Sequence, residues 1–326
     1  MRFRAALSVG AVLAVSVAAE GAGGDAPLVF VSNEKSGTVT VIDGAANRVT
    51  GTIAVGARPR GIQAAPDGRH VYVAVSDKAD RSREAIVEIE TAGRTISARY
   101  LCGTDPEQLA VSPDGRRLYV SNEDASTASV IEIPSGKLLS TVKVGEEPEG
   151  VAASPDGRRA VVTSEAGNAV FVLDAHSDRI AATVPVDGRP RAAQFSPDGS
   201  RLYVTAELGA ALSVVDARQW KVLHRVPTPG GVRAVGVLVS LDGRRVWVTT
   251  SHANSIAVFD AERMEFIASI PVGRRPWGIA RTADGTRLFT ANGVSNDVSV
   301  VDAAEGRVVA TIPVGQAPWG VAVVGR

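Results

Sequence analysis

Short runs in which apolar and polar residues alternate are the most regular feature of this chain. They include residues 38–43, 71–73, 118–120, 202–204 and 298–302. A period of two places alternate side chains on opposite faces, which predicts β-strands. Valine and tyrosine dominate the runs, and both favour strands. With 33 glycines and only 5% aromatic residues, the chain suits many short strands joined by tight turns better than long helices.

A turn tripeptide, Pro-Asp-Gly or a near copy, recurs just before these runs. Proline presets φ and glycine accepts a positive φ, so the tripeptide closes a tight hairpin. Successive copies lie 42 to 47 residues apart, and this is the length of one four-stranded propeller blade. The copies are marked by Asp67, Asp114, Asp156, Asp198, Asp242 and Asp284.

A second repeated loop, Gly-x-x-Pro, sets the number of blades at seven. After its last copy, the chain supplies only one strand, over 318–323. The N-terminal part supplies three strands that lack the first strand of a blade, over 28–33, 38–43 and 49–55. We therefore predict an all-β, seven-bladed β-propeller with four-stranded antiparallel blades, in which the N-terminal strands pair with the C-terminal strand in one blade. Such closure removes exposed sheet edges. The loop prolines are Pro59, Pro106, Pro148, Pro190, Pro276 and Pro318, with a variant over 229–232.

The first residues follow the pattern of a secretory signal peptide. A basic head at Arg2 and Arg4 precedes an apolar run over 5–19 and then small residues. We expect a signal peptide over 1–22, cleaved somewhere within 18–24, and a single propeller domain over 23–326. This predicts a periplasmic or secreted protein with no membrane span after cleavage. The alternative is an uncleaved anchor, for which the apolar run is short.

Charge and metal-ligating residues narrow the chemistry. The formal net charge is zero, so nucleic acid is not an expected partner. Cys102 is the one cysteine, which excludes an internal disulfide, a Cys-x-x-Cys-His haem attachment and a cysteine zinc site. The four histidines have no metal-ligand spacing. We expect no cofactor and no metal.

Antiparallel alternation places the Gly-x-x-Pro loop and the loop after each second strand on one face, opposite the Pro-Asp-Gly turns. We call this the top face. Residues next to the loop prolines are expected to ring the mouth of the central channel: Arg60, Glu107, Glu149, Arg191, Arg233, Trp277 and Trp319. The other loop adds Glu123, Glu165, Glu207, His252 and Asn292. Arginine clamps carboxylates and indole stacks on rings, so a small anionic or aromatic ligand is expected. The alternative is a solvated mouth of mutual ion pairs.

No catalytic motif stands out. The chain has no Gly-x-Ser-x-Gly elbow and no nucleotide-binding glycine loop. A carboxylate pair such as Glu123 with Glu165 could do acid–base work, but sequence does not fix its separation. No residue is therefore assigned a catalytic role, and the chain is expected not to be an enzyme.

The repeat units resemble the YVTN family of β-propellers. The matching segments are 118–122, 298–302 and 312–315, and the resemblance covers the chain beyond the signal peptide. More narrowly, 105–107, 121–124, 147–150, 163–165, 292–300 and 318–321 resemble the β-propeller proteins associated with PQQ-dependent alcohol catabolism. That resemblance implies a place beside a transport system and periplasmic quinoprotein oxidation. It does not imply PQQ binding, and it transfers no catalytic residue.

The sequence thus favours an exported, non-enzymatic binding or scaffolding propeller, monomeric and accessory to PQQ-dependent alcohol oxidation. Its expected partner is an unknown small molecule or a periplasmic protein, such as a quinoprotein dehydrogenase or a transporter component. Three alternatives stay open. They are a propeller lactonase or hydrolase using top-face glutamates and arginines, a haem-binding propeller with His252 as axial ligand, and a surface-layer-like module.

Overall fold

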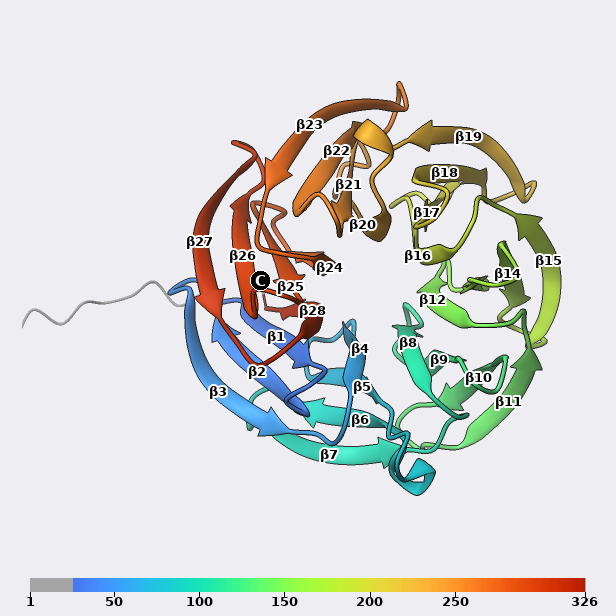
Figure 1. Cartoon of the computed structure of the whole chain (residues 1–326). Helices are drawn as coiled ribbons and strands as arrows, with labels where there is room; N and C mark the ends of the chain where they lie inside the picture. The colour runs from blue at the N-terminus through green and yellow to red at the C-terminus, as the bar shows by residue number, and fades with distance from the viewer. Residues whose placement is uncertain (1–25, 326) are drawn as a thin grey trace, which may run out of the picture.

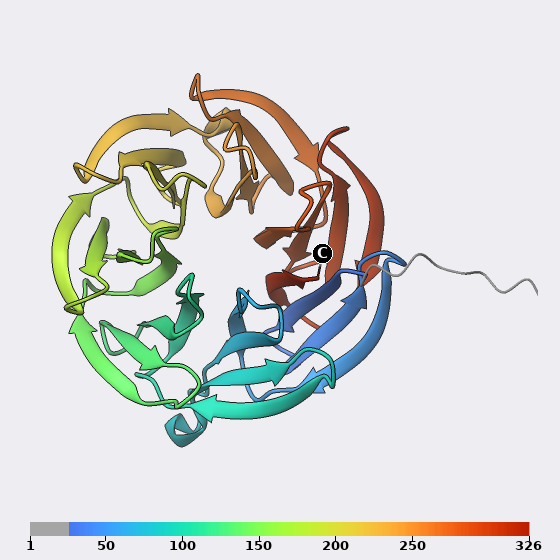
Figure 2. The same ribbon diagram turned by 180° about the vertical axis from the view of Figure 1, so that it is seen from behind.

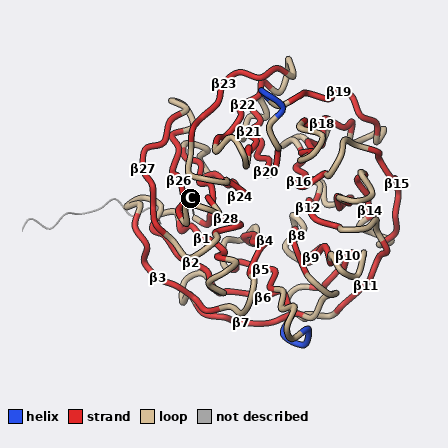
Figure 3. The backbone as a smooth tube through the Cα atoms, in the orientation of Figure 1, coloured by secondary structure: helices blue, strands red, loops and turns tan. Residues whose placement is uncertain are grey.

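Seven four-stranded antiparallel sheets stand around a central channel in the computed structural model, which describes residues 26–325 (Figure 1). Nearly all of this part is strand or tight turn (Figure 3). The predicted all-β seven-bladed propeller is therefore confirmed. The expected signal peptide and its cleavage region lie outside the described residues.

Each blade runs from an inner strand at the channel to an outer strand at the rim (Figure 1). In the blade that closes the ring, the order is β28 (Pro318–Val324), β1 (Leu28–Asn33), β2 (Thr38–Asp43), β3 (Arg48–Ala54). The next three blades are β4 (Pro59–Ala64), β5 (His70–Val75), β6 (Ala85–Glu90), β7 (Thr95–Tyr100); β8 (Pro106–Val111), β9 (Arg117–Asn122), β10 (Thr127–Glu132), β11 (Leu138–Lys143); and β12 (Pro148–Ala153), β13 (Arg159–Ser164), β14 (Ala169–Asp174), β15 (Arg179–Pro185). The last three are β16 (Pro190–Phe195), β17 (Arg201–Ala206), β18 (Ala211–Asp216), β19 (Lys221–Pro227); β20 (Ala234–Val239), β21 (Arg245–Thr250), β22 (Ser255–Asp260), β23 (Glu265–Pro271); and β24 (Pro276–Arg281), β25 (Arg287–Asn292), β26 (Asp297–Asp302), β27 (Arg307–Pro313).

Two single-turn 3₁₀ helices, Arg81–Arg83 and Pro229–Gly231, interrupt the loops. Within residues 26–325, no helix is long and apolar enough to cross a membrane.

The ring closes through an antiparallel pairing of β1 with β28. Leu28 lies opposite Val324 and Val31 opposite Val321, with a register shift before Asn33 pairs with Pro318. Views from both sides show the blue N-terminal strands and the red C-terminal strand in one blade (Figures 1 and 2). This is the pairing that the unequal numbers of strands at the two ends of the repeat predict.

The hydrophobic core lies between blades. Each cluster of buried side chains combines the strands of two neighbouring blades, as where Tyr72 from β5 packs with Leu109 from β8 and Val120 from β9. Tyr119, Tyr203 and Phe289 occupy the equivalent place in other blades and are almost fully buried. The second-strand aromatics thus fill the wedges between sheets, where large flat side chains bury most area.

Glycines on the inner strands let neighbouring blades approach closely at the channel. A Cβ on Gly150 would lie 2.5 Å from the Arg191 carbonyl oxygen, and one on Gly278 would lie 2.8 Å from the Trp319 carbonyl oxygen. Hydroxyl groups tie the same level together: Ser121 Oγ donates to the Glu149 carbonyl at 2.6 Å, and Thr249 Oγ1 donates to the Trp277 carbonyl at 2.7 Å. The backbone beneath the channel mouth is therefore held rigidly.

Candidate functional site

The second residue of each inner strand lies at the top-face end of the channel, and six of these seven positions are those predicted from the loop prolines. They are Arg60, Glu107, Glu149, Arg191, Trp277 and Trp319. The seventh is Val235 rather than Arg233. Ala234 pairs with Thr250 as Pro190 pairs with Ala206, so β20 begins one residue later than its irregular loop suggested. Arg233 precedes the strand and still reaches the site.

Backbone hydrogen bonds hold the two kinds of top loop together. The N–H groups of Glu123, Glu165 and Glu207 each donate at 2.9 Å to the carbonyl of the residue before the loop proline. Those residues (Asp105, Glu147 and Arg189) have φ between 49° and 59°. A left-handed conformation is unusual for a residue with a side chain, and it turns the carbonyl toward the neighbouring loop. The pairing brings the acidic and basic side chains of both loops to one level.

One group of charges, which we call the Arg191 cluster, gathers three carboxylates around one guanidinium. Arg191 Nη1 lies 3.0 Å from Glu149 Oε1 and also contacts Glu165, while its Nε lies 3.8 Å from Glu207 Oε2. Arg189 Nε lies 2.6 Å from Glu165 Oε2, and Arg233 Nη1 lies 3.2 Å from Glu207 Oε1. The members are Glu149, Glu165, Arg189, Arg191, Glu207 and Arg233.

The three carboxylates of this cluster are not equivalent. Glu165 contacts two guanidinium groups and Glu207 contacts three, whereas Arg191 is the only one within ion-pair distance of Glu149 among the described residues. All three side chains are buried. A buried carboxylate with a single cationic partner is the least favourable of the three to ionise.

Burial accordingly raises the pKa of Glu149 from its ordinary 4.5 to about 8. The Arg191 charge opposes this rise, and the neighbouring Glu165 charge adds to it. For Arg191, burial by itself lowers the pKa, but the Glu149 and Glu165 carboxylates outweigh burial and raise it. The pair therefore combines a fixed cation with a carboxyl group that exchanges its proton near neutral pH.

This shift predicts a pH-dependent stability. Below about pH 4.5 both folded and unfolded chains hold the Glu149 proton; between that pH and about 8 only the folded chain holds it, so stability falls as pH rises. Glutamine does not titrate, so the Glu149→Gln variant should not lose stability in this way. We expect its free energy of unfolding, relative to that of the wild type, to increase by about 1–3 kcal/mol from pH ~5 to pH ~9, measured by urea unfolding. The exposed neighbour Glu146→Gln should show no gain, and a Glu149→Gln variant that is equally destabilised at every pH would contradict the shift.

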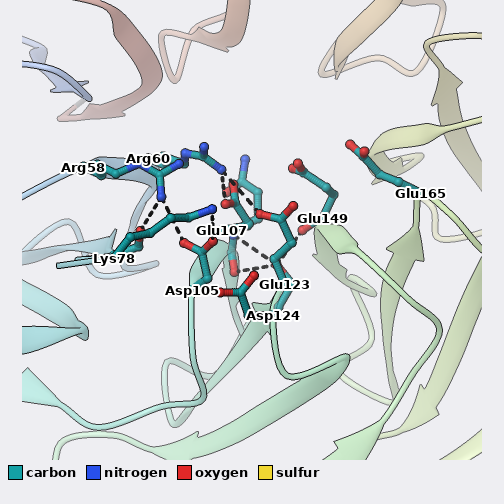
Figure 4. A network of polar contacts seen from close by, with 12 residues as sticks. Arg58, Arg60, Lys78, Asp105, Glu107, Glu123, Asp124, Glu149 and Glu165 are labelled. Carbon is teal, nitrogen blue, oxygen red and sulfur yellow. Dashed lines mark hydrogen bonds and ion pairs between the residues drawn. The ribbon is translucent and has the colours of Figure 1, made fainter. Parts of the chain in front are cut away.

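The second group, the Arg60 cluster, lies beside the first (Figure 4). Arg60 contacts Glu107 and lies 3.1 Å from Glu34 and 3.9 Å from Glu123. Behind them, Asp105 is completely buried between Arg58 at 3.3 Å and Lys78 at 3.0 Å. Its members are Glu34, Arg58, Arg60, Lys78, Asp105, Glu107 and Glu123.

Three carboxylates of the Arg60 cluster are close enough to share a cation. Ligand atoms of Asp105, Glu107 and Glu123 all lie within 4.8 Å of one another. Glu107 is fully buried, and apart from the Arg60 contact neither of its carboxylate oxygens has a hydrogen-bond partner among the described residues. Oxygen ligands of this kind suit Ca²⁺ or Mg²⁺. The Arg60 guanidinium already contacts Glu107, however, so an ion would have to displace it.

Aromatic side chains complete the mouth opposite the carboxylates. The Trp277 and Trp319 rings stack with centroids 6.2 Å apart and planes 16° apart. The guanidinium carbons of Arg191 and Arg275 lie 5.1 Å and 4.9 Å from the centroid of Trp277. Arg191 thus joins the carboxylates to the stacked tryptophan pair.

Two predicted residues lie apart from these clusters. Asn292 is buried, and its amide nitrogen donates to Asp297 at 2.7 Å and Ser299 at 2.9 Å, bridging β25 to β26. His252 is exposed, and its Nδ1 lies 3.1 Å from Ser251 Oγ. Glu123 and Glu165, suggested above as a pair, fall in different clusters. Sequence reasoning missed Lys78 and four residues that directly precede a loop proline: Arg58, Asp105, Arg189 and Arg275. The recurrence of a charged residue at this position of the repeat could have indicated the last four.

The comparison with protein families assigns the class. A family model described as lactonase, seven-bladed β-propeller, matches residues 24–155 and 150–323. The chain belongs to this family. This contradicts the expectation of a non-enzymatic binding or scaffolding protein accessory to PQQ-dependent oxidation, because the family is one of enzymes. The lactonase alternative fits better.

Solved structures confirm the fold. The periplasmic gluconolactonase PpgL of Pseudomonas aeruginosa superposes with a TM-score of 0.76 at 22% identity, covering 92% of this chain and 99% of that one. The dihydro-haem d1 dehydrogenase NirN superposes at 0.68 and 18%, covering 94% and 77%. Hydrazine synthase from Kuenenia stuttgartiensis superposes at 0.72 and 20%, covering 81% and 89%. A comparison with curated proteins finds no match.

Proposed function

We propose that the protein is a lactone hydrolase whose active site is the Arg191 cluster. The observation that carries the proposal is Glu149, a buried carboxylate with one guanidinium partner and a pKa raised to about 8. Ester hydrolysis needs a group that accepts and returns a proton, and a cation where the carbonyl oxygen becomes negative. Glu149 and Arg191 provide both at one end of the channel, and membership of the lactonase family supports the same chemistry.

The steps follow from these two side chains. Ionised Glu149 takes a proton from a water molecule as its oxygen attacks the lactone carbonyl carbon. The carbonyl π-electrons move to the oxygen, which the Arg191 guanidinium stabilises. When the intermediate collapses, the ring C–O bond breaks and the ring oxygen takes the proton from Glu149. One water is added, and a hydroxy acid leaves with Glu149 ionised again.

A panel of γ- and δ-lactones, followed by acid release, tests this proposal. We expect turnover that increases with pH up to about 8, because ionised Glu149 is the base. The Glu149→Gln variant should lose about 100-fold in kcat/KM, whereas Glu146→Gln, in the same loop but exposed, should keep full activity. EDTA should change nothing, because the Arg191 cluster uses no metal. Absence of turnover across the panel would refute the proposal, and loss of activity in EDTA would move the chemistry to the Arg60 cluster.

Export of the protein remains a prediction, and we propose a periplasmic or secreted location from the signal-like pattern of residues 1–22. The narrower resemblance to propellers associated with PQQ-dependent alcohol catabolism is not confirmed by the family match.

A further inference from the structure

Below the charged mouth, the central channel holds a cavity. Its volume is about 520 Å³, within the range of small-molecule sites. Residues from the Pro-Asp-Gly side line its lower end, among them Pro155, Pro197 and Leu241. Above them the wall combines apolar side chains, including Ala110, Phe195 and Ile279, with polar ones such as Gln63 and Gln194, so it can contact both the apolar and the polar part of a ligand.

Arg281 is the one charged residue among those lining this cavity. It occupies the sixth position of inner strand β24. The sixth position of the other six inner strands is always apolar: Ala64, Val111, Ala153, Phe195, Val239 and Val323. The structure of a blade therefore does not require an arginine at this position, and Arg281 distinguishes β24 from the other six inner strands.

The Arg281 guanidinium has no counter-charge. Its Nε donates to the Val239 carbonyl oxygen at 3.3 Å, and no carboxylate of residues 26–325 lies within ion-pair distance. Burial lowers its pKa, with no neighbouring acid to offset the effect. The side chain nevertheless stays charged, because arginine does not deprotonate in proteins. A half-buried cation of this kind, in a wall without acids, is a ready partner for an anion.

We propose that the lower channel binds an amphiphilic organic monoanion, with its carboxylate on Arg281 and its apolar body against the apolar side chains of the mixed wall. A single cation matches a single negative charge, and the planar guanidinium fork matches a carboxylate. The site does not depend on the lactone hydrolysis proposed above, because it shares no residue with the Arg191 cluster.

Calorimetric titration of the full chain with octanoate tests the site, with octanamide and inorganic phosphate as matched probes. Octanamide has the same tail without the charge, and phosphate has charge without a tail. We expect octanoate to bind at least about tenfold more tightly than either. Equal binding of octanamide would overturn the role of the cation, and equal binding of phosphate would overturn the apolar class of ligand. Absence of octanoate binding would overturn the proposal itself.

Two variants assign the binding to this cavity. Arg281→Gln should weaken octanoate binding at least about tenfold, and Ala153→Phe should also weaken it by filling the wall while leaving the charge. Arg244→Gln removes a charge from an exposed turn on the same face and serves as the control. Thermal unfolding checks that each variant is folded. Unchanged octanoate affinity in Arg281→Gln would refute the site, and because lactone turnover is measured separately, neither result decides the other.

Discussion

Replacing Arg191 with methionine is expected to abolish most of the proposed lactone hydrolysis and to destabilise the fold. The substitution removes the guanidinium that contacts Glu149, and it removes a contact from Glu165 and Glu207 as well. Removing one partner from a buried ionic group typically costs about 3–5 kcal/mol. Losing the cation at the carbonyl oxygen should lower kcat by a further factor of about 10² to 10³.

Two further variants separate the possible causes. Arg225→Met breaks the ion pair between Arg225, on outer strand β19, and Asp187. The contact distance of 3.3 Å is similar to that between Arg191 and Glu149, but Arg225 is exposed, so this substitution should cost less than about 1 kcal/mol of stability. Arg191→Lys keeps the positive charge but lacks the planar set of donors of a guanidinium. Compared with Arg191→Met, it should restore much of the stability but little of the activity. If Arg191→Met unfolds at the same urea concentration as Arg225→Met and turns over lactone normally, the cluster is neither structural nor catalytic.

The Gly150→Ala variant is expected to be less stable and less active, because the added methyl group forces two neighbouring strands apart. A Cβ here would lie 2.5 Å from the Arg191 carbonyl oxygen and 2.8 Å from Ala192 Cα, both backbone atoms of β16. Strands β12 and β16 would have to separate at the level where Glu149 meets Arg191. We expect a loss of about 2–4 kcal/mol and of about 10- to 100-fold in kcat/KM.

Gly188→Ala is the matched control for this effect. Its Cβ would find its nearest neighbour at 3.7 Å, which is ordinary contact, and its backbone does not need glycine. Urea unfolding and lactone turnover of the two alanine variants, compared side by side, measure the cost of crowding alone. Equal behaviour would show that the inner strands tolerate a methyl group, and the rigid spacing argued above would then be wrong.

The fold was predictable because it repeats. Pro-Asp-Gly at Asp114 or Asp156 fixes a turn by backbone chemistry that needs no knowledge of distant contacts, and the spacing of the copies supplies the blade length. The prediction of residue positions was less accurate where the repeat is irregular. Around 229–232 the loop proline is displaced, and the position expected for Arg233 belongs to Val235.

The chemistry was less predictable, because it depends on burial and on contacts between blades. Glu146, Glu147 and Glu149 are three acids of one short segment, yet only Glu149 is buried and paired with Arg191 from the next blade. No local motif records that pairing. The sequence contains no compact catalytic motif, which favoured a non-enzymatic interpretation, whereas the family match places the chain among lactonases. The groups of the proposed site come from several loops that only the folded chain brings together.

The seam between β1 and β28 also constrains how the molecule is made. A ribosome releases β1 first and β28 after every other strand, so the earliest strand must wait with one side unpaired while the rest of the protein is synthesised. Only then can the first sheet be completed. Premature termination just before Pro318 would leave β1 bare toward the pore, and such products should be recognised as defective by proteases or lost to aggregation.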